Sequence, residues 1–171
     1  MKRYDDILKG GDLRSIGKAN EVAKVVVNQN DFDQLFKYLF HKDRKVVMRT
    51  ADAIEKITLK RFGYLTPHKK DILRLCSETV NIELKWHLAL LLSRLELTEK
   101  ELGQVWQFLT MWATDKNEAK IVRVNSVQSL FNIFKTNNAF KQDFNFTIDE
   151  IMKENIPSLN ARIRKIKNAS T

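Results

Sequence analysis

The sequence predicts an all-α protein, and three observations support this fold class. Only 5 glycines and 2 prolines occur in 171 residues, too few for the many tight turns of a β-sandwich or barrel. Apolar side chains recur at the spacing of one face of an α-helix. The same apolar pattern also returns every 38 residues, which indicates stacked copies of one helical unit.

The repeat is clearest in three segments that align without a gap: 43–57, 81–95 and 119–133. Within each segment the shared apolar positions are spaced as i, i+5, i+8 and i+11, which forms one stripe along a helix. We predict a helix over each segment. The aligned positions are Val46, Leu84 and Val122; Ala51, Ala89 and Val127; Ile54, Leu92 and Leu130; and Ile57, Leu95 and Ile133.

Further amphipathic segments lie before, between and after these three. An opening pair is predicted at Ile7–Leu8 and at 19–27, separated by a loop at 10–12. Partner helices are predicted over 31–40, 68–78 and 99–112, and a closing pair over 147–154 and after Pro157. The length of the chain then corresponds to four to five helix pairs.

Capping residues mark several of the predicted helix starts. Asp43 is placed to cap the helix of 43–57. Thr98 with Glu101 has the spacing of a capping box. Thr66 followed by Pro67 is interpreted as the N-cap and first turn of the next helix, because proline is favoured at the first helical position.

The pattern V-x(4)-A-x(2)-I-x(2)-I of residues 46–57 resembles the second helix of HEAT or armadillo-type repeats, and the resemblance covers roughly 31–167. The opening GGDLRSIG (10–17) is also similar to that of a short bacterial HEAT-like family without assigned activity. The resemblance implies a right-handed α–α superhelix (a solenoid) forming a single repeat domain over 1–171. It also implies that the second helices line a concave face, and it implies no catalytic activity.

The sequence contains no pattern typical of a catalytic or cofactor site. Phosphate-binding glycine loops, the nucleophile elbow and the zinc-protease helix are all absent. The three histidines are scattered, and Cys76 is alone on an apolar stripe. We therefore expect a non-enzymatic protein without cofactor or metal. The single cysteine and the lack of a signal peptide or bilayer-spanning run favour a cytoplasmic protein that does not bind membranes.

The positive charge is concentrated in two blocks of the chain. The net charge is +9. Residues 41–80 carry ten basic and five acidic side chains, and the segment RIRKIK (162–167) is strongly basic, whereas 81–120 has one more acid than base. Such blocks favour an anionic ligand, either an acidic peptide or nucleic acid.

Polar and cationic residues also fall at equivalent positions of successive second helices, where the resemblance places the concave face. We predict that the protein is a non-catalytic scaffold that presents a concave, partly cationic groove to a protein or acidic peptide. The candidate groove residues are Arg49, Lys56, Lys85, Trp86, His87, Arg94, Arg123, Asn125 and Asn132.

Two alternative functions compete with the scaffold hypothesis. The cationic positions are compatible with a nucleic-acid-binding module. Trp112 followed by Asp115 loosely resembles HEAT-like DNA glycosylases, although core packing is the simpler interpretation of Trp106 and Trp112.

Asp52 is interpreted as part of an exposed ion-pair ladder with its helical neighbours Arg49 and Lys56.

Overall fold

The computed structural model describes residues 4–9 and 17–169, whose regular secondary structure consists of α- and 3-10 helices. The prediction of an all-α repeat fold is therefore confirmed. The loop predicted at 10–12 lies outside the described residues. The fold divides into two compact units, residues 1–71 (the N-terminal unit) and 72–171 (the C-terminal unit). Each unit is described by itself below.

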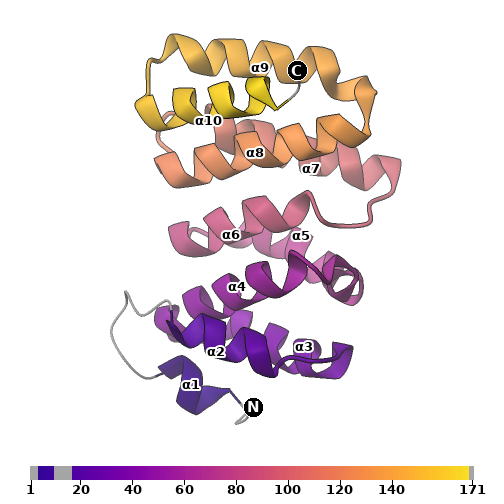
Figure 1. Ribbon diagram of the computed structural model, residues 1–171, viewed down its shortest axis with the longest axis vertical. Helices are drawn as coiled ribbons and strands as arrows, with labels where there is room; N and C mark the ends of the chain where they lie inside the picture. Colours follow the sequence, from indigo (N-terminus) through magenta and orange to yellow (C-terminus); the bar gives the residue numbers. More distant parts are fainter. Residues whose placement is uncertain (1–3, 10–16, 170–171) are drawn as a thin grey trace. The chain divides into compact units, whose positions relative to one another are not determined.

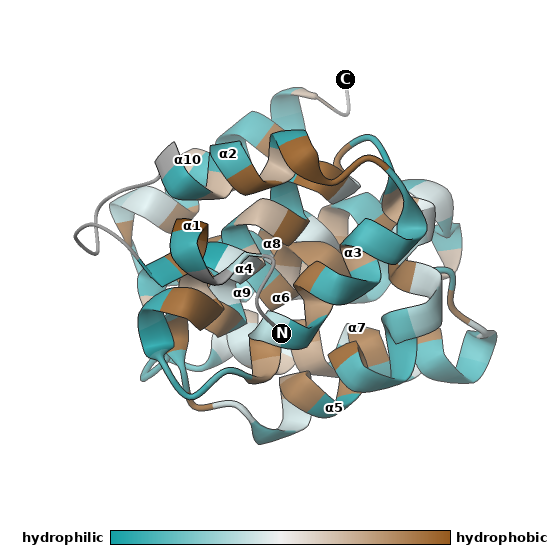
Figure 2. Cartoon of the chain, turned by 90° about the horizontal axis from the view of Figure 1, so that it is seen from below, coloured by the Kyte–Doolittle hydropathy of each residue, from teal (hydrophilic) through white to brown (hydrophobic). Residues whose placement is uncertain are grey.

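The helices of the N-terminal unit surround α4 (Arg44–Thr58), which contacts α1, α2, α3 and both short 3-10 helices. In Figure 2, α2 and α3 carry both teal and brown residues, the amphipathic pattern expected of helices with one buried side. The other elements are α1 (Asp5–Lys9), α2 (Gly17–Val25), α3 (Gln29–Phe36), η1 (Lys37–Phe40) and η2 (Phe62–His68).

The C-terminal unit contains two layers of helices. Helix α8 (Lys120–Thr136) contacts α6 (Ile82–Leu92) and α10 (Pro157–Asn168), which form one layer with it. Figure 1 shows these three helices stacked one above another. The other layer consists of α5 (Lys69–Glu78, whose first turn belongs to the N-terminal unit), α7 (Glu99–Thr114) and α9 (Lys141–Lys153).

The 38-residue period is reproduced by the helix starts. Helices α4, α6 and α8 begin at Arg44, Ile82 and Lys120, each 38 residues after the last. The small-residue position of the repeat, Ala51, Ala89 and Val127, is fully buried. The predicted apolar stripe therefore forms the packed side of each second helix, and burial of such side chains is the main stabilising contribution to the fold.

Two of the predicted helix starts are confirmed. The Asp43 side chain accepts a hydrogen bond from the Lys45 amide at 2.9 Å. Thr98 and Glu101 form the predicted capping box, with the Thr98 amide donating to Glu101 Oε2 at 2.8 Å. The start predicted at Thr66–Pro67 is wrong, because these residues belong to η2 and α5 begins after them.

In the part of the chain that the structure describes, none of the helices is both long enough and apolar enough to cross a bilayer.

Candidate functional site

Helices α6 and α8, the second helices of successive repeats, are connected by two polar contacts with the same sequence separation. Asn125 Nδ2 donates to the Trp86 carbonyl oxygen at 3.0 Å, and Asn132 Nδ2 donates to Ser93 Oγ at 3.3 Å. In both pairs the partners are 39 residues apart. The contacts align the two helices along their length, with Asn125 buried and Asn132 exposed.

Further hydrogen bonds extend this row to the last helix. Gln128 Nε2 donates to Asn132 Oδ1 at 3.0 Å, and Arg162 of α10 donates through one terminal nitrogen to Gln128 Oε1 at 2.8 Å. We call Ser93, Asn132, Gln128 and Arg162 the polar ladder. It runs across α6, α8 and α10, and its side-chain amides are held by one another in defined orientations.

Apolar side chains lie near the starts of α6 and α8, at the opposite end of these helices from Ser93 and Asn132. Ile82 is one turn before Trp86, and Ile121 is one turn before Asn125, so the two isoleucines share the 39-residue offset of the hydrogen-bonded pairs. Ile82 is 44% exposed, Ile121 is 43% exposed and Trp86 is half-buried. We call these three residues the apolar end of the face.

Two predicted groove cations are instead buried inside their units, which corrects the expectation that they face a ligand. Arg49 of the N-terminal unit is 1% exposed and donates to the Leu8 carbonyl oxygen at 2.5 Å. Arg123 of the C-terminal unit is also 1% exposed; its Nε donates to the Ala113 carbonyl oxygen at 2.8 Å. Both guanidinium groups bind the carbonyl end of a helix, where cations are favoured.

Arg123 has a second partner in Glu154, the residue that follows α9. Its two terminal nitrogens donate to the two carboxylate oxygens at 2.9 and 2.8 Å. Hydrogen bonding from Arg123 is the largest effect on Glu154 and lowers its pKa; burial raises the pKa to a smaller extent, and the positive charges of Arg123 and Lys116 lower it further. The Glu154 carboxylate therefore stays ionised at neutral pH.

The remaining predicted groove residues differ in accessibility. Lys85 Nζ contacts Glu118 at 2.5 Å and lies 5.9 Å from the centre of the Trp112 ring. Lys56 of the N-terminal unit pairs with Asp52 at 2.8 Å, which agrees with the Lys56 part of the predicted ladder, although both side chains are half-buried and Arg49 is buried. His87 is buried at 5% exposure, and Arg94 is half-buried just beyond α6. The positive charges of both lysines are thus compensated inside their own units.

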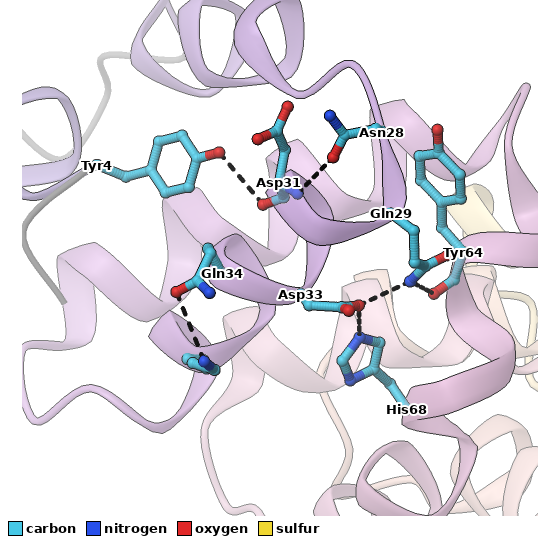
Figure 3. Close-up of polar contacts among 9 residues, drawn as sticks. Tyr4, Asn28, Gln29, Asp31, Asp33, Gln34, Tyr64 and His68 are labelled. Atoms are coloured by element: carbon cyan, nitrogen blue, oxygen red, sulfur yellow. Dashed lines mark hydrogen bonds and ion pairs between the residues drawn. The ribbon is translucent and has the colours of Figure 1, made fainter.

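A polar cluster in the N-terminal unit was not predicted from the sequence. His68 Nε2 and Asp33 Oδ1 are 2.7 Å apart, and Gln29 donates both to Asp33 Oδ1 at 2.7 Å and to the Tyr64 carbonyl oxygen at 3.1 Å. Figure 3 shows these side chains pointing toward one another from α3 and η2. The His68 ring stacks on Phe36 at 3.9 Å. These contacts hold η2 against α3.

The residues considered for catalysis are either buried or located at a helix end. Trp112 is 3% exposed, and Asp115 ends α7 and accepts from the Asn117 amide at 2.9 Å, so this pair does not present an aromatic ring to a nucleic-acid base. Cys76 is buried, and burial raises the pKa of its thiol to about 12. Among the described residues, no group of three or more His, Cys, Asp and Glu side chains could hold a metal ion.

The accessible part of the site is thus the polar ladder with the apolar end. Of these residues, the sequence analysis proposed Trp86 and Asn132 as groove candidates; it did not propose Ser93, Gln128, Arg162, Ile82 or Ile121, and its candidate Asn125 is buried. The signal for Ser93 was present: an offset of 39 residues, in place of 38, pairs Trp86 with Asn125 and Ser93 with Asn132. Gln128 and Arg162 give no such signal, because their separation of 34 residues matches neither the 38-residue period nor the 39-residue offset.

Comparison with known proteins gives one match. A family model described as a HEAT repeat domain matches residues 12–170. The search of curated proteins and the search of solved structures gave no match.

Proposed function

This chain belongs to the HEAT repeat family, and from that premise we propose that it is a non-catalytic scaffold that binds a partner protein through an extended peptide segment. The binding face is the polar ladder and apolar end of the C-terminal unit. The family supports a helical scaffold, which is commonly used for protein interaction. The proposal that the ligand is an extended peptide rests on the oriented side-chain amides of the polar ladder.

A side-chain amide offers both a donor and an acceptor, the same pair of groups as a peptide bond. Asn132 is exposed, and its contacts with Ser93 and Gln128 leave capacity on both its nitrogen and its oxygen. Because these contacts already fix the amide, little side-chain entropy is lost when a ligand binds. An extended peptide can therefore hydrogen-bond through its backbone along the ladder.

The two ends of the face differ in chemistry and so give the ligand a direction. Trp86, Ile82 and Ile121 favour an apolar side chain, because exposed apolar area is removed from water on binding. Arg162 at the other end favours a carboxylate, which a guanidinium binds with charge-assisted hydrogen bonds. The expected ligand is an extended segment with an apolar residue near α6 and an acidic residue near α10.

The test uses a fluorescently labelled peptide library in which apolar and acidic positions are varied at fixed spacing. Fluorescence anisotropy with the full chain should select apolar–acidic peptides. Asn132→Ala and Trp86→Ala should each weaken binding about tenfold, or about 1.4 kcal/mol. Asn145→Ala, an exposed asparagine on α9, is the matched control and should leave binding unchanged.

Two outcomes would reject the proposal. One is that no library peptide binds, and the other is that Asn132→Ala and Asn145→Ala behave alike. The same assay with a labelled DNA or RNA duplex tests the alternative. Tight binding that weakens steeply with added salt would assign the protein to nucleic acid instead.

A further inference from the structure

Beyond its first turn, the outward face of α7 lacks charge. No Lys, Arg, Asp or Glu occurs in residues 102–114, although 30% of the chain is charged. This helix is nevertheless on the surface: Gln104 and Gln107 are exposed, and Met111 is 53% exposed. The outward side of a surface helix normally carries charged residues. An uncharged outward face is typical of a contact surface.

Hollows flank α7 on both sides. One of about 620 Å³ lies between α5 and α7 and is lined by Leu73 and Phe108 among others. The other, of about 530 Å³, lies between α7 and α9 beside Phe146, which is 70% exposed. Gln107 and Met111 line both hollows. Helix α7 is therefore a ridge with a groove on each side.

We propose that this surface is the interface between two copies of the chain. A ridge flanked by grooves is complementary to itself, because the ridge of each copy enters a groove of the other, as in helix–helix packing. The contact closes with two-fold symmetry and uses the same patch on both copies. A net charge of +9 opposes association, and the uncharged stretch removes this repulsion where the copies meet.

The charges at the edges of the patch select its orientation. Arg74 lines the hollow on the α5 side, whereas Asp143 and Glu150 line the hollow on the α9 side. A two-fold axis parallel to α7 lays α5 of one copy over α9 of the other, so Arg74 faces the two carboxylates. An axis perpendicular to α7 would lay α5 on α5 and α9 on α9, with like charges opposed. The dimer therefore has its axis along α7.

The experiment is sedimentation equilibrium of the full chain over a wide concentration range. The parent chain should dimerise. Met111→Asp and Phe146→Asp should each raise the dimer dissociation constant at least about tenfold. Both side chains are exposed, so circular dichroism melting should remain close to that of the parent. Ile121→Asp, which places the same charge on the α6–α8 face, is the matched control and should still dimerise.

A charge-reversal set tests the orientation. Arg74→Glu should weaken the dimer, and Arg74→Glu combined with Asp143→Arg and Glu150→Arg should restore it. A parent chain that remains monomeric throughout the range overturns the proposal, as does a Met111→Asp variant that dimerises like the parent. Failure of the combined variant to restore association overturns the parallel axis. Peptide binding at the polar ladder is measured separately, so the two proposals succeed or fail independently.

Discussion

Arg123 and Glu154 form a two-pronged ion pair that connects α8 to the end of α9, with both nitrogen–oxygen distances below 3 Å. The Arg123 side chain is 1% exposed and the Glu154 side chain 16%. An arginine of this kind binds a carboxylate in a fixed planar geometry that lysine does not reproduce. The pair thus has a structural role at a position that the repeat pattern suggested for ligand binding.

Replacement of Arg123 by methionine should strongly destabilise the protein. The change removes a buried cation together with its hydrogen bonds to the Ala113 carbonyl oxygen and to the partly exposed Glu154 carboxylate, which should cost about 2–3 kcal/mol. Urea denaturation measures the loss as a lower free energy of unfolding. Lys153→Met is the matched control: it removes an exposed ion pair with Glu150 and should cost at most about 1 kcal/mol. Equal effects of the two substitutions would contradict the structural role of Arg123.

The contribution of Glu154 should depend on pH. Its pKa is lower in the folded state than in the unfolded chain, so the stabilisation is fully present above the unfolded value of about 4.3. It is lost as the pH falls through the lowered folded pKa. Parent and Glu154→Gln should therefore differ most in unfolding free energy at pH 7 and converge in strong acid. A difference that is constant from neutral to acidic pH would show that the carboxylate charge is not the cause.

Cys76 should be unreactive in the folded protein. The side chain is 4% exposed, and its pKa of about 12 leaves almost no thiolate at pH 8, the form that attacks disulfide reagents. A chromogenic disulfide reagent should label the native protein slowly and the urea-unfolded protein at once. Rapid labelling under native conditions would place the thiol on an accessible surface.

Asn155 should tolerate glycine and reject β-branched residues. It follows the C-cap of α9 with φ of 55°, in the left-handed region that asparagine and glycine adopt more readily than other residues. Asn155→Val should cost about 1–2 kcal/mol, whereas Asn155→Gly should be nearly neutral in thermal unfolding. The reverse order would be inconsistent with a left-handed backbone at this position.

Much of the fold could be predicted from the sequence, because a helical stripe and its period are local properties. The burial of Ile54, Leu92 and Leu130 follows from their place on that stripe. The caps at Asp43 and Thr98 also depend only on nearby residues. These predictions needed no knowledge of which helices meet.

The accessible site was harder to predict because it depends on distant contacts. Arginine is usually a surface residue, yet Arg49 and Arg123 are buried. Each donates a hydrogen bond to a carbonyl oxygen of another helix, that of Leu8 and that of Ala113 respectively. No helical periodicity reveals such a partner. Gln128 joins the polar ladder through Asn132 on its own helix and through Arg162, which packing brings close from 34 residues away.

The partners of Arg123 also affect how the end of the array unfolds. One guanidinium bridges the last residues of α7 to the residue after α9, so adjacent helix pairs share a contact that neither can keep alone. In repeat arrays, coupling between neighbours decides whether a terminal unit frays by itself. Here α7, α8 and α9 should exchange their amide hydrogens as one cooperative unit, with protection reaching close to the C-terminal helix.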